Sequence, residues 1–153
     1  DLKRKRNSRR ELQGRVIHEP VCDRHCWADK ASRFRKTRIM KEYLGGCHCG
    51  EIKFKFYSEE SVEVWKCNCS ICKILDYEHL FIVHEDFKII KGNELLSKYS
   101  FGTQKAKHIF CKNCGIKSFY QPRSHPNSYS INLKCVEDPP EIKNTVHFDG
   151  KNI

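Results

Sequence analysis

The chain has 153 residues, of which 39% are hydrophobic and 31% are charged, and its formal net charge is +10. This length suits one domain with its own core and is short for two ordinary domains. No apolar run approaches the roughly 20 residues of a membrane-spanning helix, and the charged N-terminus is not followed by the apolar segment of a signal peptide. We therefore expect an intracellular protein, cytoplasmic or nuclear, that makes no membrane contact.

Positive charge is concentrated in the first part of the chain. Residues 1–44 carry 14 Lys and Arg against 6 Asp and Glu, a net +8, whereas residues 45–153 carry 15 against 13, a net +2. The run over residues 3–6 and the pair at 9–10 are typical of nuclear targeting or of binding to a polyanion, but also of a solvated arm without a partner. The sequence therefore divides into a basic extension, 1–44, and a nearly neutral domain, 45–153.

Within the extension we expect poor order or partial helix. Residues 28–43 are basic and helix-compatible, although their apolar residues are poorly spaced for an amphipathic helix. Cys22, His25 and Cys26 lie close enough in sequence to share a metal ion. No second pair of ligands is nearby, so we expect an incidental cluster there.

From Gly45 onward the pattern predicts an all-β domain of short antiparallel strands. Residues Glu51–Tyr57 alternate polar and apolar, as a half-buried strand does. Only Ser70–Leu75 has the character of a helical turn. Further strands are expected at Val62–Lys66, Leu80–His84, Phe87–Lys91, Leu96–Phe101, Lys107–Phe110, Lys117–Tyr120, Ser128–Leu133 and Thr145–Phe148.

Seven of the ten cysteines fall into three short clusters. Disulfides are one explanation of so many cysteines, but close spacing in a chain without a secretory signal favours metal binding. Two clusters are cysteine pairs, each followed by a glycine that allows a sharp turn: Cys47-x-Cys49-Gly50 and Cys111-x-x-Cys114-Gly115. Two pairs complete a tetrahedral, structural type of zinc site.

The middle cluster, Cys67-x-Cys69-x-x-Cys72, supplies three thiolates from one segment and leaves a fourth position to be filled. If that position is open, the metal can activate a bound thiol or water; if a side chain fills it, the site is structural. The spacing favours neither alternative. The candidate side chains for the fourth position are Cys135, His79, His84 and His108, and for His108 a structural role is equally compatible.

Four segments together resemble the centromere protein V / glutathione-dependent formaldehyde-activating enzyme family, and the likeness runs from about Gly45 to Asp149. It is closer to the eukaryotic, centromere protein V-like branch than to the bacterial enzymes. The segments are GGCHCG (45–50), CNCSIC (67–72), FCKNCGIKSFY (110–120) and QPRSHP (121–126).

The resemblance implies a β-tent-like fold with two zinc ions and carbon–sulfur lyase chemistry. In the bacterial enzymes this chemistry joins formaldehyde to glutathione. By the same resemblance, one zinc is structural and the other is of the catalytic type. The resemblance implies that the structural zinc is bound by Cys47, Cys49, Cys111 and Cys114, and the catalytic-type zinc by Cys67, Cys69 and Cys72.

Two functional hypotheses follow. In the first, the chain acts on the adduct of a thiol such as glutathione with a small aldehyde, and Arg123 pairs with a carboxylate of the substrate. A structural salt bridge is an equally good role for Arg123. In the second, both zinc ions are structural, and residues 1–44 bind chromatin, another nucleic acid or another polyanion.

Overall fold

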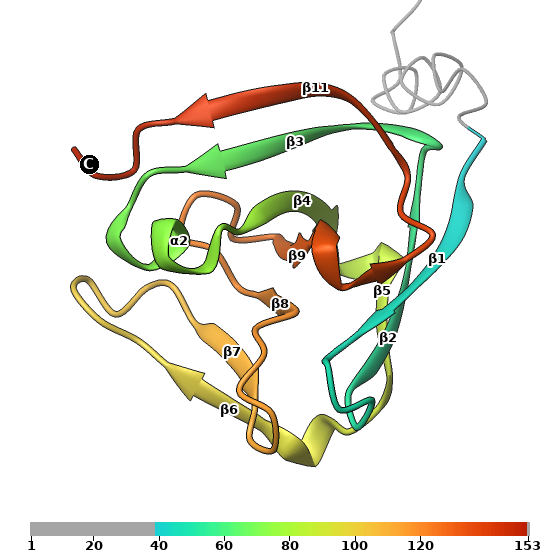
Figure 1. Ribbon diagram of the computed structural model, residues 1–153, viewed down its shortest axis with the longest axis horizontal. Helices are drawn as coiled ribbons and strands as arrows, with labels where there is room; N and C mark the ends of the chain where they lie inside the picture. The colour runs from blue at the N-terminus through green and yellow to red at the C-terminus, as the bar shows by residue number, and fades with distance from the viewer. Residues whose placement is uncertain (1–38, 153) are drawn as a thin grey trace, which may run out of the picture. The chain divides into compact units, whose positions relative to one another are not determined.

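Three β-sheets make up the part of the chain that the computed structural model describes, residues 39–152 (Figure 1). The all-β class expected from the sequence is confirmed. The only α-helix of these residues, α2 (Ser70–Leu75), coincides with the expected helical turn. Three short 3-10 turns cover His84–Asp86, Asn93–Leu95 and Leu133–Cys135. The strands are β1 (Lys41–Gly46), β2 (Lys53–Ser58), β3 (Ser61–Cys67), β4 (Glu78–Val83), β5 (Phe87–Lys91), β6 (Leu96–Tyr99), β7 (His108–Cys111), β8 (Phe119–Tyr120), β9 (Ser128–Asn132), β10 (Val136–Glu137) and β11 (Glu141–Phe148).

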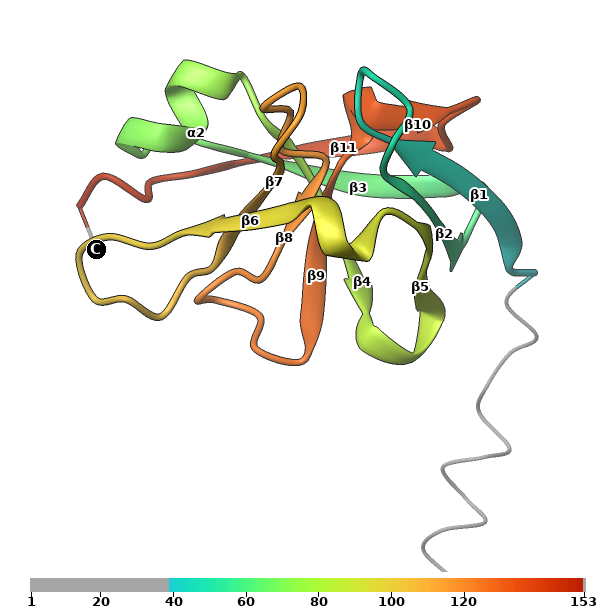
Figure 2. The same cartoon turned by 90° about the horizontal axis from the view of Figure 1, so that it is seen from below.

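The strand order is β10-β1-β2-β5 in the first sheet and β11-β3-β4-β9-β8 in the second, while β6 and β7 form a separate pair. Neighbouring strands are antiparallel, with one departure from the expected pattern: β11 runs parallel to β3. The chain leaves the first sheet at β10 and joins the second beside the start of β3, where the Glu141 N–H donates to the Glu60 carbonyl. Figures 1 and 2 show the two strands side by side.

Strand β1 begins four residues before the expected start of the domain. Its inward positions are Tyr43 and Gly45, of which only Tyr43 carries a side chain. A Cβ atom at Gly45 would lie 2.6 Å from the Phe54 ring, so glycine makes room for that ring. The apolar alternation that identifies a strand is therefore hidden in the sequence at this point.

Residues 41–43 belong to strand β1, whereas the sequence left a basic helix over 28–43 open. The rest of that segment lies outside the described residues, and so do Cys22, His25 and Cys26. Among residues 39–152, no helix has the length and apolar character needed to cross a membrane.

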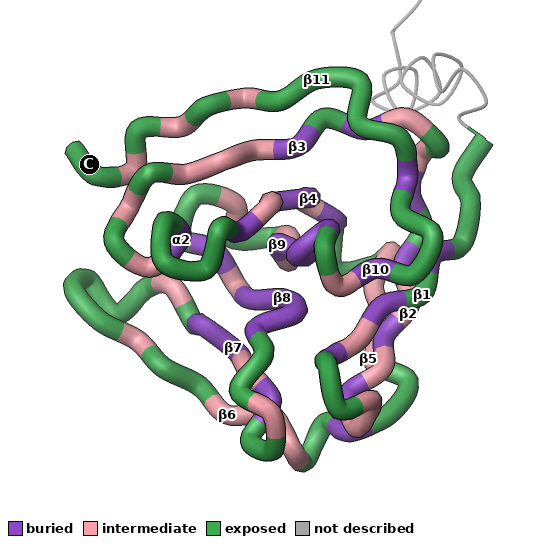
Figure 3. Tube along the Cα trace, in the orientation of Figure 1, coloured by how far each residue is buried: buried purple, intermediate pink, exposed green. Residues whose placement is uncertain are grey.

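Aromatic side chains fill the core between the sheets. Phe54 and Phe56 of β2 are completely buried, because the strand alternates them with the outward-facing Lys53 and Lys55. The Phe54 ring centroid lies 5.4 Å from that of Phe119 in an edge-to-face arrangement. Figure 3 shows the buried positions gathered on β2, β4, β7, β8 and β9, with exposed residues along much of β11 and α2. Cys47 and Cys111 belong to this core, and Cys114 packs against it, so the core positions the turns that carry these cysteines.

The parallel pairing of β11 with β3 carries the end of the described chain to the middle cysteine cluster. In the register of this pair, Phe148 lies opposite Cys67. The Asn68 N–H donates to the Phe148 carbonyl at 3.2 Å, and the Asn68 side chain donates to Asp149 at 2.8 Å. Segments 80 residues apart in sequence therefore form one wall of a site.

Candidate metal centres and active-site cavity

The two cysteine pairs come together into one group, here called the four-cysteine cluster: Cys47, Cys49, Cys111 and Cys114. All four sulfur atoms lie within 4.8 Å of one another. The Sγ atom of Cys49 lies 3.5 Å from that of Cys47 and 3.7 Å from that of Cys111. Four sulfurs bound tetrahedrally at about 2.3 Å would be about 3.8 Å apart. The donor set and its spacing therefore fit a tetrahedral metal ion.

Each pair sits on a tight turn of the same design. Gly50 and Gly115 have φ angles of +78° and +74°, which glycine adopts without strain. The Gly50 N–H donates to the Cys47 carbonyl at 3.1 Å, and the Gly115 N–H donates to the Cys111 carbonyl at 2.8 Å. These turns leave the Ile52 N–H free to donate to the Cys47 sulfur at 3.3 Å. Amides that point at sulfur stabilise thiolates, the form that binds metal.

The middle motif forms the three-cysteine cluster: Cys67, Cys69 and Cys72. Cys67 ends β3, Cys69 precedes the first residue of α2, and Cys72 lies inside that helix. Their sulfur atoms also lie within 4.8 Å of one another. Burial raises the pKa of the Cys72 thiol, so a thiolate at this position needs a nearby positive charge. Three thiolates facing one point are a donor set that suits a metal ion.

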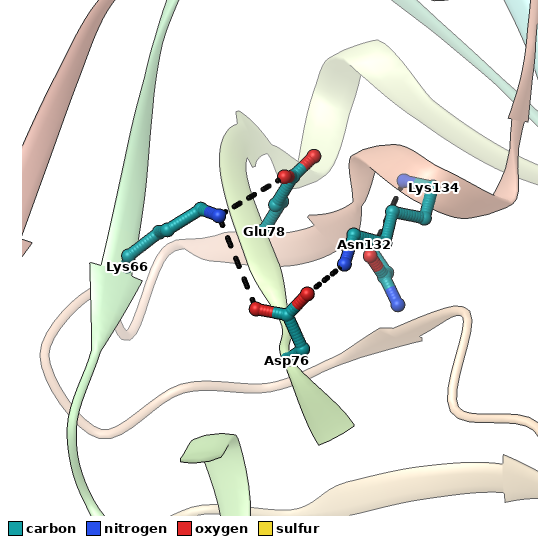
Figure 4. Close-up of polar contacts among 5 residues, drawn as sticks. All are labelled: Lys66, Asp76, Glu78, Asn132 and Lys134. Atoms are coloured by element: carbon teal, nitrogen blue, oxygen red, sulfur yellow. Dashed lines mark hydrogen bonds and ion pairs between the residues drawn. The ribbon is translucent and has the colours of Figure 1, made fainter. Parts of the chain in front are cut away.

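The helix that carries Cys72 is anchored through Asp76, its C-cap residue. Asp76 ends α2 in the left-handed conformation at φ 46°. Its carboxylate pairs with Lys134, and its other oxygen lies 3.9 Å from Lys66, which also reaches Glu78 at 3.4 Å (Figure 4). These contacts are exposed and contribute little to stability. They join the end of α2 to β3, β4 and the 3-10 turn after β9.

The three-cysteine cluster opens into a cavity of about 470 Å³. Arg123 lines the same cavity, so the chain folds this residue toward the cluster from a segment more than 50 positions away. No ion pair of Arg123 is found among the described residues. The aromatic part of the wall comes from Trp65, Phe81 and Phe148. A cavity of this size, apolar with a few polar groups, is typical of a small-molecule site.

Four side chains were candidates for the fourth position of the three-cysteine cluster. His79 and His108 line the cavity, while the exposed His84 hydrogen-bonds Gln121 at 2.8 Å. Cys135 is half-buried, and burial, with the charge of Cys114, raises its pKa to about 11. Among residues 39–152, no further histidine, cysteine, aspartate or glutamate joins the three sulfurs within 4.8 Å. All three cysteines line the cavity, so the cluster has a side open to it.

Lys117 is the site residue that the sequence did not identify. Its side chain is only 6% exposed, and Nζ lies 3.6 Å from the centre of the Tyr120 ring and 4.9 Å from that of Tyr77. Burial lowers the pKa of Lys117 to about 8, while the thiolates of the three-cysteine cluster act to raise it. A lysine in an expected strand is normally taken to face solvent, so no sequence signal marks it.

Comparison with known proteins gives the family. A sequence profile described as "Glutathione-dependent formaldehyde-activating enzyme" matches residues 42–150. The chain belongs to this family.

Two further proteins are similar to this chain. An uncharacterized lyase of Schizosaccharomyces pombe is 33% identical over 117 residues, which cover 67% of this chain and 84% of that protein. The crystal structure of a Rhodobacter sphaeroides protein is also 33% identical, with a TM-score of 0.56, and the likeness covers 61% of this chain and 87% of the other. Membership of the formaldehyde-activating enzyme family and a lyase relative support a lyase type of activity. The nearer likeness to the centromere protein V branch stays a prediction.

Proposed function

We propose that this chain is a zinc-dependent carbon–sulfur lyase-type enzyme that acts on the adduct of a glutathione-like thiol with a small aldehyde. The observation that carries the proposal is the placement of the three-cysteine cluster. It offers three thiolates to a metal and faces a cavity of about 470 Å³ instead of a fourth protein ligand. The four-cysteine cluster, which is complete, would hold a second, structural zinc.

The family and the donor chemistry both support zinc in the two clusters. Zinc at the three-cysteine cluster would supply Lewis acidity that stabilises a thiolate near neutral pH. The residues around the cavity would bind the substrate and shield it from water. Arg123 is free to pair with a carboxylate of the thiol, and the guanidinium geometry suits a bidentate contact. The rings of Trp65, Phe81 and Phe148, which line the cavity, would limit the access of water to the reacting atoms.

The reaction in this proposal is the reversible addition of a thiolate to an aldehyde. The thiol first gives its proton to water. The sulfur then bonds to the carbonyl carbon, the π electron pair moves to the oxygen, and the oxygen takes one proton from water, so that no proton is gained or lost overall. The reverse reaction breaks the same carbon–sulfur bond. No atom of the protein is consumed, so the chain has only to bind, orient and stabilise charge.

Metal content and turnover of Cys69→Ser test the proposal. We expect about two zinc ions in the wild type, one at each cysteine cluster, and one in the variant. The variant should keep its fold, measured by circular dichroism, because the four-cysteine cluster is intact. Catalysed exchange between formaldehyde and its glutathione adduct, followed by NMR, should fall to the uncatalysed rate.

Cys135→Ser is the matched control, because Cys135 belongs to neither cluster. It should keep both zinc ions and full activity. A wild type that binds no thiol and does not accelerate the exchange would overturn the proposed activity.

A further inference from the structure

His79 has a buried ring nitrogen without a partner. The side chain is 3% exposed and lines the cavity, and its Nε2 is the one buried side-chain nitrogen or oxygen of residues 39–152 that makes no hydrogen bond. Buried polar atoms in folded proteins are nearly always paired, because desolvation without a partner is costly. Because His79 lines the cavity, a ligand bound there is the candidate partner for Nε2.

The surrounding contacts keep this nitrogen in place. Nδ1 of His79 is 2.8 Å from the Ser130 hydroxyl, which β9 presents across the antiparallel pair with β4. The Tyr120 hydroxyl approaches the same nitrogen at 3.5 Å. The ring centroids of Tyr77 and Phe81 lie 4.5 Å and 5.9 Å from that of the imidazole. These contacts favour the ring orientation in which Nε2 has no protein partner.

The electrostatic surroundings keep this histidine neutral. Burial, with the charges of Lys117 and His125, lowers the pKa of His79 to about 3. A neutral imidazole carries one hydrogen, and the nitrogen that holds it depends on the partner of the other. The contact with Ser130 is compatible with either tautomer. We assign the tautomer in which the Ser130 hydroxyl donates to Nδ1 and the hydrogen lies on Nε2, which makes His79 a neutral hydrogen-bond donor.

We propose that His79 donates a hydrogen bond from Nε2 to the oxygen of the one-carbon unit when a thiol adduct of an aldehyde occupies the cavity. The inference rests on the proposed function. When the thiolate adds to the carbonyl carbon, negative charge develops on that oxygen, and the Nε2–H group stabilises it until water supplies the proton. His79 keeps its own hydrogen throughout. Removal of one such preorganised donor lowers turnover by about 10²–10³-fold.

Two substitutions separate this role from packing. Asparagine places its amide near the position of Nδ1, so His79→Asn keeps a partner for Ser130 and loses the group at Nε2. Glutamine reaches the position of Nε2, so His79→Gln restores the donor. We expect His79→Asn to lose about 10²–10³-fold in turnover of the formaldehyde–glutathione adduct, with unchanged zinc content and unchanged affinity for glutathione alone, and His79→Gln to lose far less. His84→Asn, at an exposed histidine outside the cavity, should match the wild type.

Nitrogen-15 NMR of the histidine rings gives a readout that needs no substitution. We expect Nε2 of His79 to be the protonated nitrogen in the free protein, and its resonance to shift when the adduct binds but much less with glutathione alone. Equal turnover of wild type and His79→Asn, or a hydrogen on Nδ1 in place of Nε2, would overturn the inference while the proposed function stands. A wild type that neither binds nor turns over the adduct would overturn both.

Discussion

Lys117 donates a hydrogen bond from Nζ to Nδ1 of His108 across 2.7 Å, and both side chains are buried. An ammonium group can only donate, so Nδ1 accepts and the hydrogen of the neutral imidazole lies on Nε2. Burial and the charge of Lys117 lower the pKa of His108 to about 4, and burial lowers that of Lys117 to about 8. Near neutral pH the lysine is therefore charged and the histidine is neutral. One buried cation thus stands beside the three-cysteine cluster.

Replacement of Lys117 should weaken metal retention at that cluster. The thiolates of Cys67, Cys69 and Cys72 interact with the Lys117 charge, and a positive charge nearby favours the thiolate form. In Lys117→Met we expect the pH at which half of the zinc is released to shift upward. A chelator assay over a pH series measures it. Lys98→Met, at an exposed residue of β6, should leave the midpoint where it is in the wild type, and an unchanged midpoint in both variants would contradict the expectation.

The stability of the fold should fall as the pH drops below about 6.5, and His108 should account for part of this loss. Its pKa is lowered to about 4 from 6.5, so between these values the unfolded chain binds a proton that the folded chain does not. Between these pH values, each such group lowers the free energy of unfolding by about 1.4 kcal/mol for each unit that the pH falls, so stability is highest above pH 6.5. In His108→Gln, the free energy of unfolding should change less steeply with pH by about this amount. Urea unfolding at several pH values compares the two, and parallel pH profiles would contradict this assignment.

Gly150 should be intolerant of even a methyl group. A Cβ atom there would lie 2.4 Å from the Cys67 sulfur, so the sulfur would have to move. We expect Gly150→Ala to lose metal from the three-cysteine cluster while the four-cysteine cluster keeps its ion. The metal-to-protein ratio should fall by about half if two zinc ions are bound at the start. Asn152→Ala, at an exposed neighbour, serves as the control, and full metal content in Gly150→Ala would show that the segment after β11 does not constrain Cys67.

The basic N-terminal residues should account for any affinity for polyanions. Residues 1–38 include the basic positions 3–6 and 9–10. Deletion of residues 1–38 leaves β1 intact and should abolish binding to heparin and to double-stranded DNA at low salt, because contacts of Lys and Arg with phosphate or sulfate dominate such binding. Fluorescence anisotropy over a salt series measures it. Retained, salt-dependent binding by the shortened chain would place the basic surface in the β domain.

Several elements could be predicted because their signals are local. Strand β5 coincides with the expected Phe87–Lys91, and α2 with Ser70–Leu75, since each is short, regular and bounded by turn residues. Strand β1 was missed because Gly45 replaces the apolar side chain that would have shown the alternation. The parallel pairing of β11 with β3 was not visible either. Which strand a segment joins depends on the path of the whole chain and not on the segment's own composition.

The donor chemistry of this protein could be read from its sequence: the three cysteine clusters, the glycines at the turns of the two outer clusters, and the β class of the domain. The surroundings of the middle cluster became visible in the folded chain alone. It placed Arg123, His79 and His108 around one cavity, left Nε2 of His79 without a protein partner, and buried Lys117 between two tyrosines. The physical reason is that ligand spacing is a property of a short segment, whereas burial, and the charge state that follows from it, depends on side chains brought together from distant strands.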